Sequence, residues 1–411
     1  MNRTATRNSS FAALRYRDFR LLWLGQIVSV TGSQMQFVAI NWHVYLITKS
    51  AFALGLVGLF RAVPIIVCSL AGGVVADAID RKKLMMVTQS VMLISAAVLT
   101  VVTIAGLKSV WPIYLLSGLS SAATAFDTPA RQSLMPTLVP PEVFPNAVSL
   151  GLLVFNVATI CGPALAGVLL AESGPAVIYG LNAFSFIAVI IALVAMKTSG
   201  APEATGEQRS ALSVAALKEG FRFVWNTPII VQTMTLDFAA TFFASATLLL
   251  PIFATERLHV SARGYGFLAA APAIGSVITA LVLARFGTLR KQGRLVVGSV
   301  AIFGLATAAF GISTVFWFSL LMLAITGAAD TVSTVLRQTI RQLVTPNHLR
   351  GRMTSINMMF FMGGPQLGEL EAGSLAAVIG APLSVVTGGL GSVAAAAIAA
   401  WRSKSLMDFE V

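Results

Sequence analysis

Acidic and basic side chains that interrupt long apolar stretches are the residues of this chain best suited to chemistry. Glu369 and Glu371 stand two residues apart in GPQLGELEAG, Asp237 and Asp330 interrupt two other apolar stretches, and Arg61 lies in GLFRAVP. A charge at the centre of a membrane helix costs roughly 2.5–3.5 kcal/mol on insertion scales, so such a group usually faces a cavity or a partner. A carboxyl group in that setting can bind a proton or a cation, which is the chemistry of ion-coupled transport.

The sequence gives no pattern typical of an enzyme. His43, His259 and His348 do not have the spacing of metal ligands, and no glycine-rich loop ending in Lys and Ser or Thr is present to bind phosphates. Cys68 and Cys161 both fall in apolar stretches, which argues against a disulfide framework. We therefore expect no catalytic residue, no metal, no cofactor and no ATP hydrolysis by this chain.

The composition is that of an integral membrane protein. Of 411 residues, 56% are hydrophobic and only 11% are charged, whereas a soluble domain has roughly a quarter charged residues. Uncharged runs long enough to cross a bilayer, about 17–25 residues, recur along the whole chain. They predict an all-α membrane protein with twelve transmembrane helices, at 21–48, 52–76, 84–106, 110–131, 146–171, 175–197, 228–253, 262–284, 294–311, 315–337, 353–378 and 382–401.

The positive charge is distributed unevenly between the two sets of loops. If both termini lie on one side, that side carries 23 of the 28 Lys and Arg residues and the opposite loops carry four, with Arg61 inside a span. The positive-inside rule then places both termini in the cytoplasm. The net charge of +12 follows this loop pattern, so we expect a lipid bilayer around the chain and no nucleic acid as a partner.

The two halves of the chain resemble one another. AATAFDTPARQSLMPTLVP (122–140) aligns without gaps with AADTVSTVLRQTIRQLVTP (328–346), and the match includes Arg131 with Arg337. The longest polar stretch divides the chain into two six-helix bundles, 1–197 and 228–411, joined by a cytoplasmic linker, 198–227. Within it KEGFRFVW is either a short amphipathic helix at the membrane surface or plain linker. Two parallel repeats are typical of transporters whose halves rock around a central site.

The loop GGVVADAIDRKK (72–83) resembles the loop signature of the major facilitator superfamily, in which Gly, three residues and Asp precede a basic cluster. With YRDFRLLWLGQIVSVTGSQMQ and FDTPARQSLMPTLVP, the likeness is to the bacterial enterobactin-exporter-like branch and covers nearly the full length. The resemblance implies a latch that holds the cytoplasmic side shut, in which Asp77 contacts the start of the eleventh helix and Arg81 pairs with Asp127. The expected latch residues are Gly73, Asp77, Arg81, Lys82, Asp127 and Arg131.

The same resemblance implies a central cavity lined by helices 1, 4, 7 and 10. Polar residues of the predicted spans fall mainly on these helices, and the candidates for contact with substrate are Gln34, Gln36, Asn41, Asn156, Asp237 and Asp330. For the uncharged members a hydrogen bond between helices is an equally good explanation. For the two aspartates we favour a functional role.

The fold that the resemblance implies packs helix 2 beside helix 11. Counting about 1.5 Å per residue, Arg61 on helix 2 and both glutamates on helix 11 then lie at nearly the same depth. We predict that Arg61 pairs with Glu369 or Glu371, with Glu369 slightly preferred, when the outer side is closed. Opening would break the pair and let protonation drive the switch. A static ion pair without a role in transport is the alternative.

Taken together, the residues and the resemblance predict a secondary active transporter in the bacterial cytoplasmic (inner) membrane. It is expected to export a small organic compound, such as a siderophore or a drug-like molecule, in exchange for protons, and to act as a monomer. A metabolite importer of the same fold, a membrane sensor or scaffold that does not transport, and a channel are the alternatives.

Overall fold

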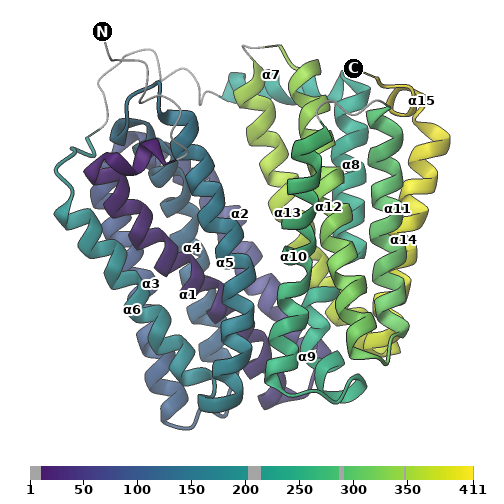
Figure 1. Cartoon of the computed structure of the whole chain (residues 1–411), viewed down its shortest axis with the longest axis horizontal. Coiled ribbons are helices and arrows are strands. Elements are labelled where there is room, and N and C mark those ends of the chain that lie inside the picture. Colours follow the sequence, from purple (N-terminus) through teal and green to yellow (C-terminus); the bar gives the residue numbers. More distant parts are fainter. Residues whose placement is uncertain (1–10, 202–213, 287–290, 347–348, 411) are drawn as a thin grey trace. The chain divides into compact units, whose positions relative to one another are not determined.

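The computed structural model describes residues 11–201, 214–286, 291–346 and 349–410, and some helical segments, including 69–74 and 358–363, without their side chains. The helices form two compact units (Figure 1). The N-terminal unit contains residues 1–47 and 60–204, and the C-terminal unit contains residues 48–59 and 205–411. Residues 48–59, which include the beginning of the second long helix (51–59), are therefore grouped with the C-terminal unit, whereas the rest of that helix belongs to the N-terminal unit.

Six long helices follow one another before the polar linker. They are α1 (Arg17–Thr48), α2 (Ala51–Ala78), α3 (Arg81–Ile104), α4 (Trp111–Leu134), α5 (Phe144–Ser173) and α6 (Pro175–Ala195). Short 3₁₀ turns, Ala12–Arg15 and Met135–Leu138, precede α1 and follow α4. Proline at the first or second position starts α4, α5 and α6, where its missing N–H leaves no hydrogen bond unmade.

The second half has the same plan with one break. It contains α7 (Val214–Trp225), α8 (Pro228–Phe243), α9 (Leu250–Ile252), α10 (Ala262–Phe286), α11 (Gln292–Ile312), α12 (Phe316–Val344), α13 (Arg350–Ile379), α14 (Ala381–Arg402) and α15 (Lys404–Met407). The α7 helix includes KEGFRFVW, so this part of the predicted linker is helical. Residues 202–213 of that linker lie outside the described part of the chain.

Most helices agree closely with the predicted spans, whereas α8 ends ten residues early and α12 extends seven residues further. Nine helical segments of the described chain are long and apolar enough to cross a membrane, judged by length and composition. Helices α1, α4 and α13 have 32, 24 and 30 residues and carry more polar side chains. At 1.5 Å per residue each is at least as long as the roughly 30 Å core of a bilayer. The all-α membrane fold is confirmed.

The predicted span 228–253 is not one continuous helix. The α8 helix ends at Phe243, and a 3₁₀ turn (Ala246–Leu249), α9 and a π-helix (Phe253–Arg257) continue the chain. Pro251 explains part of this break, because it has no N–H for the carbonyl four residues earlier and its ring would collide with that carbonyl in an α-helix. The Ser245 hydroxyl also donates to the Pro365 carbonyl of α13, at 3.2 Å. Interrupted helices in transporters frequently mark binding sites.

A carboxylate at the start of α1 fastens it to the end of α6. The Asp18 side chain accepts hydrogen bonds from the Thr198 hydroxyl at 2.6 Å and from the amides of Thr198 and Lys197 at 2.8 and 3.0 Å. Burial raises the pKa of Asp18, but these hydrogen bonds outweigh that effect and hold the pKa below its ordinary value of 3.8. The ionised carboxylate therefore stabilises this end of the N-terminal unit.

We expect Asp18→Asn to lower the thermal stability of the detergent-purified protein at pH 7 and to have a smaller effect in acid. A group with a depressed pKa contributes its stabilisation above the ordinary value near 3.8 and loses it as the pH falls through the folded-state pKa. The measurement is the unfolding temperature by intrinsic fluorescence between pH 3 and 7. An equal difference between the two proteins at every pH would contradict this assignment.

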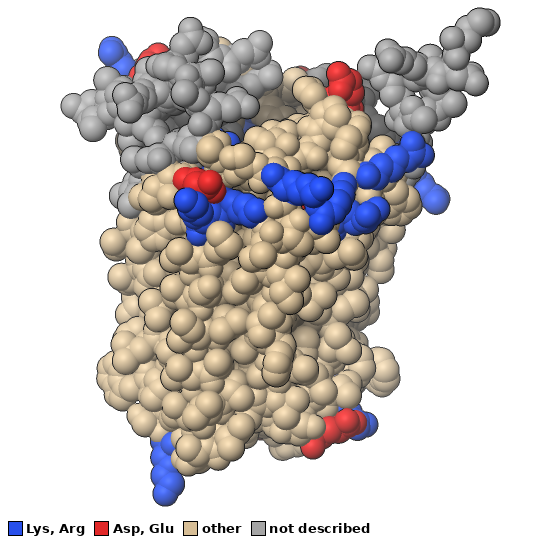
Figure 2. All heavy atoms as spheres, turned by 90° about the vertical axis from the view of Figure 1, so that its left-hand side faces the viewer, with Lys and Arg blue, Asp and Glu red and all other residues tan. Residues whose placement is uncertain are grey.

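The face of the N-terminal unit in Figure 2 shows the surface expected of a bilayer-embedded protein. Charged side chains gather near its two ends, and a broad band of uncharged side chains separates them. Many large apolar side chains are exposed, for example Phe184 at 71% and Val194 at 67%. Water would penalise such a surface, whereas lipid chains solvate it.

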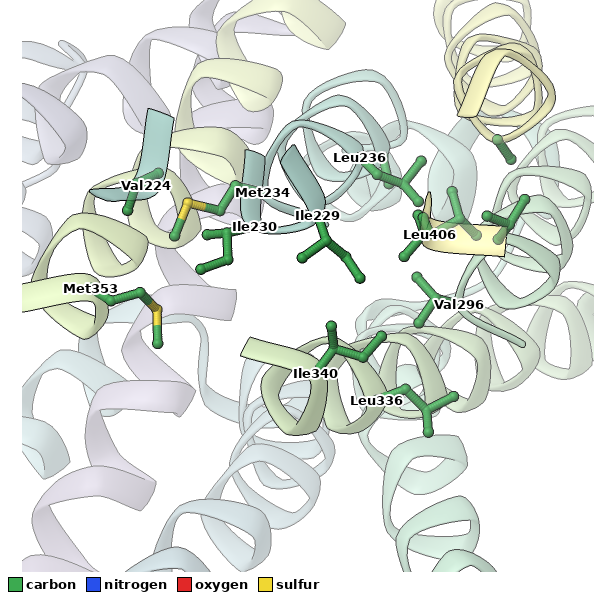
Figure 3. Packing of buried hydrophobic residues seen from close by; sticks show 14 residues of the cluster. Val224, Ile229, Ile230, Met234, Leu236, Val296, Leu336, Ile340, Met353 and Leu406 are labelled. Atoms are coloured by element: carbon green, nitrogen blue, oxygen red, sulfur yellow. The ribbon is translucent and has the colours of Figure 1, made fainter. Parts of the chain in front are cut away.

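An apolar cluster packs the C-terminal unit together near the start of α8 (Figure 3). It includes Met234 and Leu236 of α8 and Leu336 and Ile340 of α12. Leu236 and Leu336 are the sequence neighbours of Asp237 and Arg337, and Met234 and Ile340 lie three residues from them.

Candidate transport site

Asp237 and Arg337 form a buried ion pair in the C-terminal unit. The Arg337 Nη1 lies 2.8 Å from Asp237 Oδ1, and the two side chains are only 2% and 5% exposed, respectively. Arg337 is among the largest fully buried side chains of the described residues. Because each charge is removed from water, neither is stable there without the other. The pair therefore fixes α8 against α12 and holds two charges in the apolar part of the chain.

Asp330 adds a second carboxylate to the same arginine. Its Oδ1 lies 3.9 Å from Arg337 Nη2, and its side chain is 49% exposed. Thr334 lies between them along α12 and accepts a hydrogen bond from Arg337 Nη2 at 3.0 Å. Arg341 lies within electrostatic range of Asp237 and Arg337 and donates to the Asn357 side chain of α13. Among the described charged groups, two carboxylates and two guanidiniums thus share this site.

The N-terminal unit contains an equivalent contact between its first and fourth long helices, in which the partner of the arginine is uncharged. Arg131 matches Arg337 in the internal repeat, and it donates a hydrogen bond to the side-chain oxygen of Gln26. Gln26 is the tenth residue of α1, just as Asp237 is the tenth residue of α8. The first and fourth long helices of both units are therefore joined at equivalent positions. An amide takes the place of the carboxylate in the N-terminal unit.

Asp127, one of the expected latch residues, has hydrogen-bond partners on α3 other than Arg81. Asp127 accepts hydrogen bonds from the Thr88 hydroxyl at 2.9 Å and from Gln89 Nε2 at 3.0 Å. No ion pair joins it to Arg81 within the described residues, and the buried Arg81 Nε has no hydrogen-bond partner there. The uncharged polar side chains of α3 reach Asp127 because α3 and α4 pack directly together.

The other expected latch residues are distributed around this end of the N-terminal unit. Lys82 Nζ donates to the Met196 carbonyl at 2.7 Å, and Arg131 contacts Gln26 as described above. The side chain of Asp77, and Gly73 with it, falls in the segment of α2 whose side chains are outside the described residues. The latch therefore stays a prediction.

A cavity of about 110 Å³ lies within the N-terminal unit. Its lining combines one cation, Arg61, with polar groups of α1, α4 and α6 and a few apolar side chains. Gln36, one of the expected substrate contacts, lines it and accepts a hydrogen bond from Asn182 Nδ2 at 2.7 Å. The Arg61 guanidinium lies over the Phe37 ring, 4.4 Å from its centroid.

The remaining expected substrate contacts have different environments. Gln34 packs against Gly162 of α5, where a Cβ on that glycine would meet the Gln34 Cβ at 2.6 Å. Asn41 is buried, and its Oδ1 has no hydrogen-bond partner within the described residues. Asn156 is exposed on α5. The structure thus brings Asp237 together with Asp330, and places Gln36 in the cavity of the other unit.

The glutamates that motivated the coupling hypothesis differ in burial. Glu369 is buried, and a Cβ added to Gly58 of α2 would lie 2.7 Å from its Oε2. Glu371 is partly exposed. The early part of α2 thus packs against α13 through a glycine contact. Pairing of Arg61 with either glutamate stays a prediction.

Arg337 is the residue of this cluster that its position in the sequence did not indicate. It was counted among the cytoplasmic charges because it ends the predicted tenth span. The repeat match with Arg131 was the available signal, since it marked an arginine at one position in both halves. No group of three or more His, Cys, Asp or Glu side chains within the described residues could hold a metal ion.

Comparison with known proteins adds the family. The family model described as transmembrane secretion effector matches residues 8–409. The enterobactin exporter EntS of Citrobacter koseri is 26% identical over 91% of this chain and 89% of its own length, and that of Escherichia coli O81 is 26% identical over 91% and 88%.

Solved structures show the same fold. A bacterial homologue of the human lysosomal transporter Spinster superposes with a TM-score of 0.74 at 16% identity, over 93% of this chain and 96% of that one. A bacterial homologue of the iron transporter ferroportin gives a TM-score of 0.64 at 16% identity, over 92% and 98%. With its loop signature, its repeated six-helix plan and a family match over nearly its full length, the chain belongs to the transmembrane secretion effector family of the major facilitator superfamily.

Proposed function

We propose that this protein exports a small organic compound of the siderophore type across the bacterial cytoplasmic membrane in exchange for protons. The observation that carries the proposal is the Asp237–Arg337–Asp330 cluster, which holds two carboxylates on one buried arginine within a transporter fold. The names of its relatives, enterobactin exporters, support the substrate class and the direction. The excess of Lys and Arg on one side supports termini in the cytoplasm, and the single-chain repeat supports a monomer.

In this proposal Asp330 is the group that exchanges protons. It is held by Arg337 at the longer distance of 3.9 Å and is half exposed, whereas Asp237 is held at 2.8 Å and buried. When Asp330 binds a proton, Arg337 keeps one carboxylate partner and the charge balance between α8 and α12 changes. Such a change gives the two protonation states different preferred packings, which is what coupling requires. Glu369 and Glu371 with Arg61 stay the second candidate coupling set.

The test is transport by the full chain in proteoliposomes. We expect labelled enterobactin to be taken up by inside-out vesicles faster with an acidic interior than without a pH gradient. Asp330→Asn should still exchange enterobactin across the membrane in counterflow but should lose the acceleration by the gradient. Glu371→Gln is the parallel test of the second set.

The possible outcomes distinguish proton-coupled export from the alternative functions. A wild-type flux that ignores the pH gradient would show that proton coupling is wrong while transport stands. Net movement only toward the cytoplasm would favour the importer. No flux of any compound in a siderophore and drug panel, with the protein correctly inserted, would favour the sensor or scaffold.

A further inference from the structure

The cavity of the N-terminal unit carries polar groups that the coupling cluster does not use. On α4, hydroxyl side chains recur at 117, 120, 121 and 124, which places them along one face of the helix. Ser117 is 5% exposed, lines the cavity, and its hydroxyl has no hydrogen-bond partner within the described residues. A buried hydroxyl without a partner costs free energy, so a ligand that supplies an acceptor or donor there would recover it.

Close packing of α2 on α4 presents Arg61 to this hydroxyl face. Gly118 allows the approach, because a Cβ there would lie 3.0 Å from the Phe60 carbonyl oxygen. The Phe60 ring stacks on Tyr114 with 5.0 Å between centroids. Arg61, the next residue, then lines the same cavity as Ser117. A guanidinium has five N–H donors in a fixed planar fork that matches a carboxylate. It can therefore bind a carboxylate through some of these donors while the others keep their own partners.

The rest of the lining combines apolar and aromatic side chains with Ser33 and the hydrogen-bonded amides of Gln36 and Asn182. Phe37, Phe186, Ile40 and Met92 supply the walls between the polar groups. An engineered apolar cavity of roughly 150 Å³ takes up a benzene molecule, so this cavity of about 110 Å³ has the size of one small ring or head group. It is too small for a whole compound of siderophore size.

We propose that this cavity is a binding subsite for an acidic aromatic head group, a ring that bears a carboxylate or an ionised phenol. Arg61 receives the negative charge, the hydroxyl face of α4 hydrogen-bonds the ring's oxygen substituents, and Phe37 and Phe186 contact the ring. The inference rests on the proposed function, because the head group belongs to the exported compound. The N-terminal unit would then select that compound by its acidic ring.

Equilibrium binding to the detergent-purified full chain tests the subsite without transport. The probe is radiolabelled benzoate at pH 7, with unlabelled salicylate and benzylamine as competitors. We expect salicylate to displace benzoate at least as well as unlabelled benzoate does, since it adds a hydroxyl for α4. Benzylamine has nearly the same shape and the opposite charge, so it should not compete. Equal displacement by benzylamine would overturn the proposal.

Variants then assign the binding to named side chains. Arg61→Gln should weaken benzoate binding at least about tenfold, the size expected for loss of a charge-assisted hydrogen bond, whereas Arg61→Lys should keep the charge preference. Ser117→Val should weaken salicylate more than benzoate. Arg20→Gln, on the exposed side of α1, and Ser90→Ala, whose hydroxyl bonds the Met86 carbonyl of its own helix, are the matched controls and should bind as wild type does.

The proposal stays testable if Arg61→Gln does not fold. In that case Ser117→Val and the preference of the wild type for benzoate over benzylamine decide it. Unchanged benzoate binding in folded Arg61→Gln overturns it. If the protein binds benzoate but transports no compound, the subsite is supported and the proposed function is wrong. If the protein transports enterobactin but does not bind benzoate, the proposed function is supported and the subsite is wrong.

Discussion

Arg337→Gln is expected to destabilise the protein by about 3–5 kcal/mol, the usual cost of leaving one partner of a buried ion pair uncompensated. Asp237 would lose its cationic partner, which lay at 2.8 Å, in a setting where its side chain is 5% exposed. Glutamine is too short and too weak a donor to replace the guanidinium. The measurement is unfolding temperature and monodispersity by fluorescence-detected size exclusion in detergent, together with transport in proteoliposomes.

The N-terminal unit supplies a matched control for this substitution. Arg131→Gln removes the equivalent arginine, whose partner Gln26 is neutral, so no charge is left unbalanced by that loss. Its cost should be nearer the roughly 1.5–3 kcal/mol of a hydrogen bond to a charged group. Equal destabilisation by Arg131→Gln and Arg337→Gln would mean that the charge of Asp237 is unimportant.

A double variant separates structure from function. Asp237→Asn with Arg337→Gln removes both charges and should recover most of the lost stability, because a neutral pair no longer needs compensation. If proton-driven transport stays absent in this stable protein, the ion pair has a role in the transport cycle. If the double variant recovers both its stability and the acceleration of transport by the pH gradient, the ion pair serves only to hold α8 against α12.

Gly327→Val is expected to prevent correct packing of α10 on α12. A Cβ at this position would lie well under 3.0 Å from the backbone carbonyl oxygen of Pro272, and a Cβ at Gly275 would meet the carbonyl oxygen of Ala324 in the same way. Backbone atoms cannot move aside as the end of a flexible side chain can. Forced overpacking costs typically about 1–3 kcal/mol, and valine adds more volume than the single methyl of alanine. We expect loss of the folded, monodisperse fraction.

Gly298, another helix glycine of the C-terminal unit, is the matched control for Gly327. It lies on α11, and a Cβ there would have nothing within 4 Å. Gly298→Ala should leave the unfolding temperature unchanged or raise it slightly, since alanine is about 0.8–1 kcal/mol better than glycine in a helix interior. If Gly327→Ala is tolerated as well as Gly298→Ala, α10 and α12 are not in the close contact described here.

Sequence alone was sufficient to place the helices. Runs of uncharged residues predicted most long helices within a few residues, because a bilayer requires apolar length and internal backbone hydrogen bonding. The exceptions are α8, which ends at Phe243 instead of 253, and α12, which continues to Val344 beyond the predicted end at 337. The loop signature and the repeat were sufficient for the superfamily, which the family match confirms. The break after Phe243 was not predicted, since Pro251 alone could equally have kinked a continuous helix.

The partners of the charged residues were decided only by the tertiary structure. Hydropathy reports how apolar a segment is but not which face of its helix meets which neighbour, so the position of Arg337 near a predicted span end concealed its pairing with Asp237. The same limit explains why Asp127 contacts Thr88 and Gln89 instead of Arg81. Ser117, an ordinary helical serine in the sequence, becomes part of a cavity with Arg61 only because Gly118 lets two helices approach closely. Side-chain pairing in a membrane bundle depends on how each helix is rotated about its axis and on how closely the helix backbones approach. The spacing of apolar residues in the sequence specifies neither.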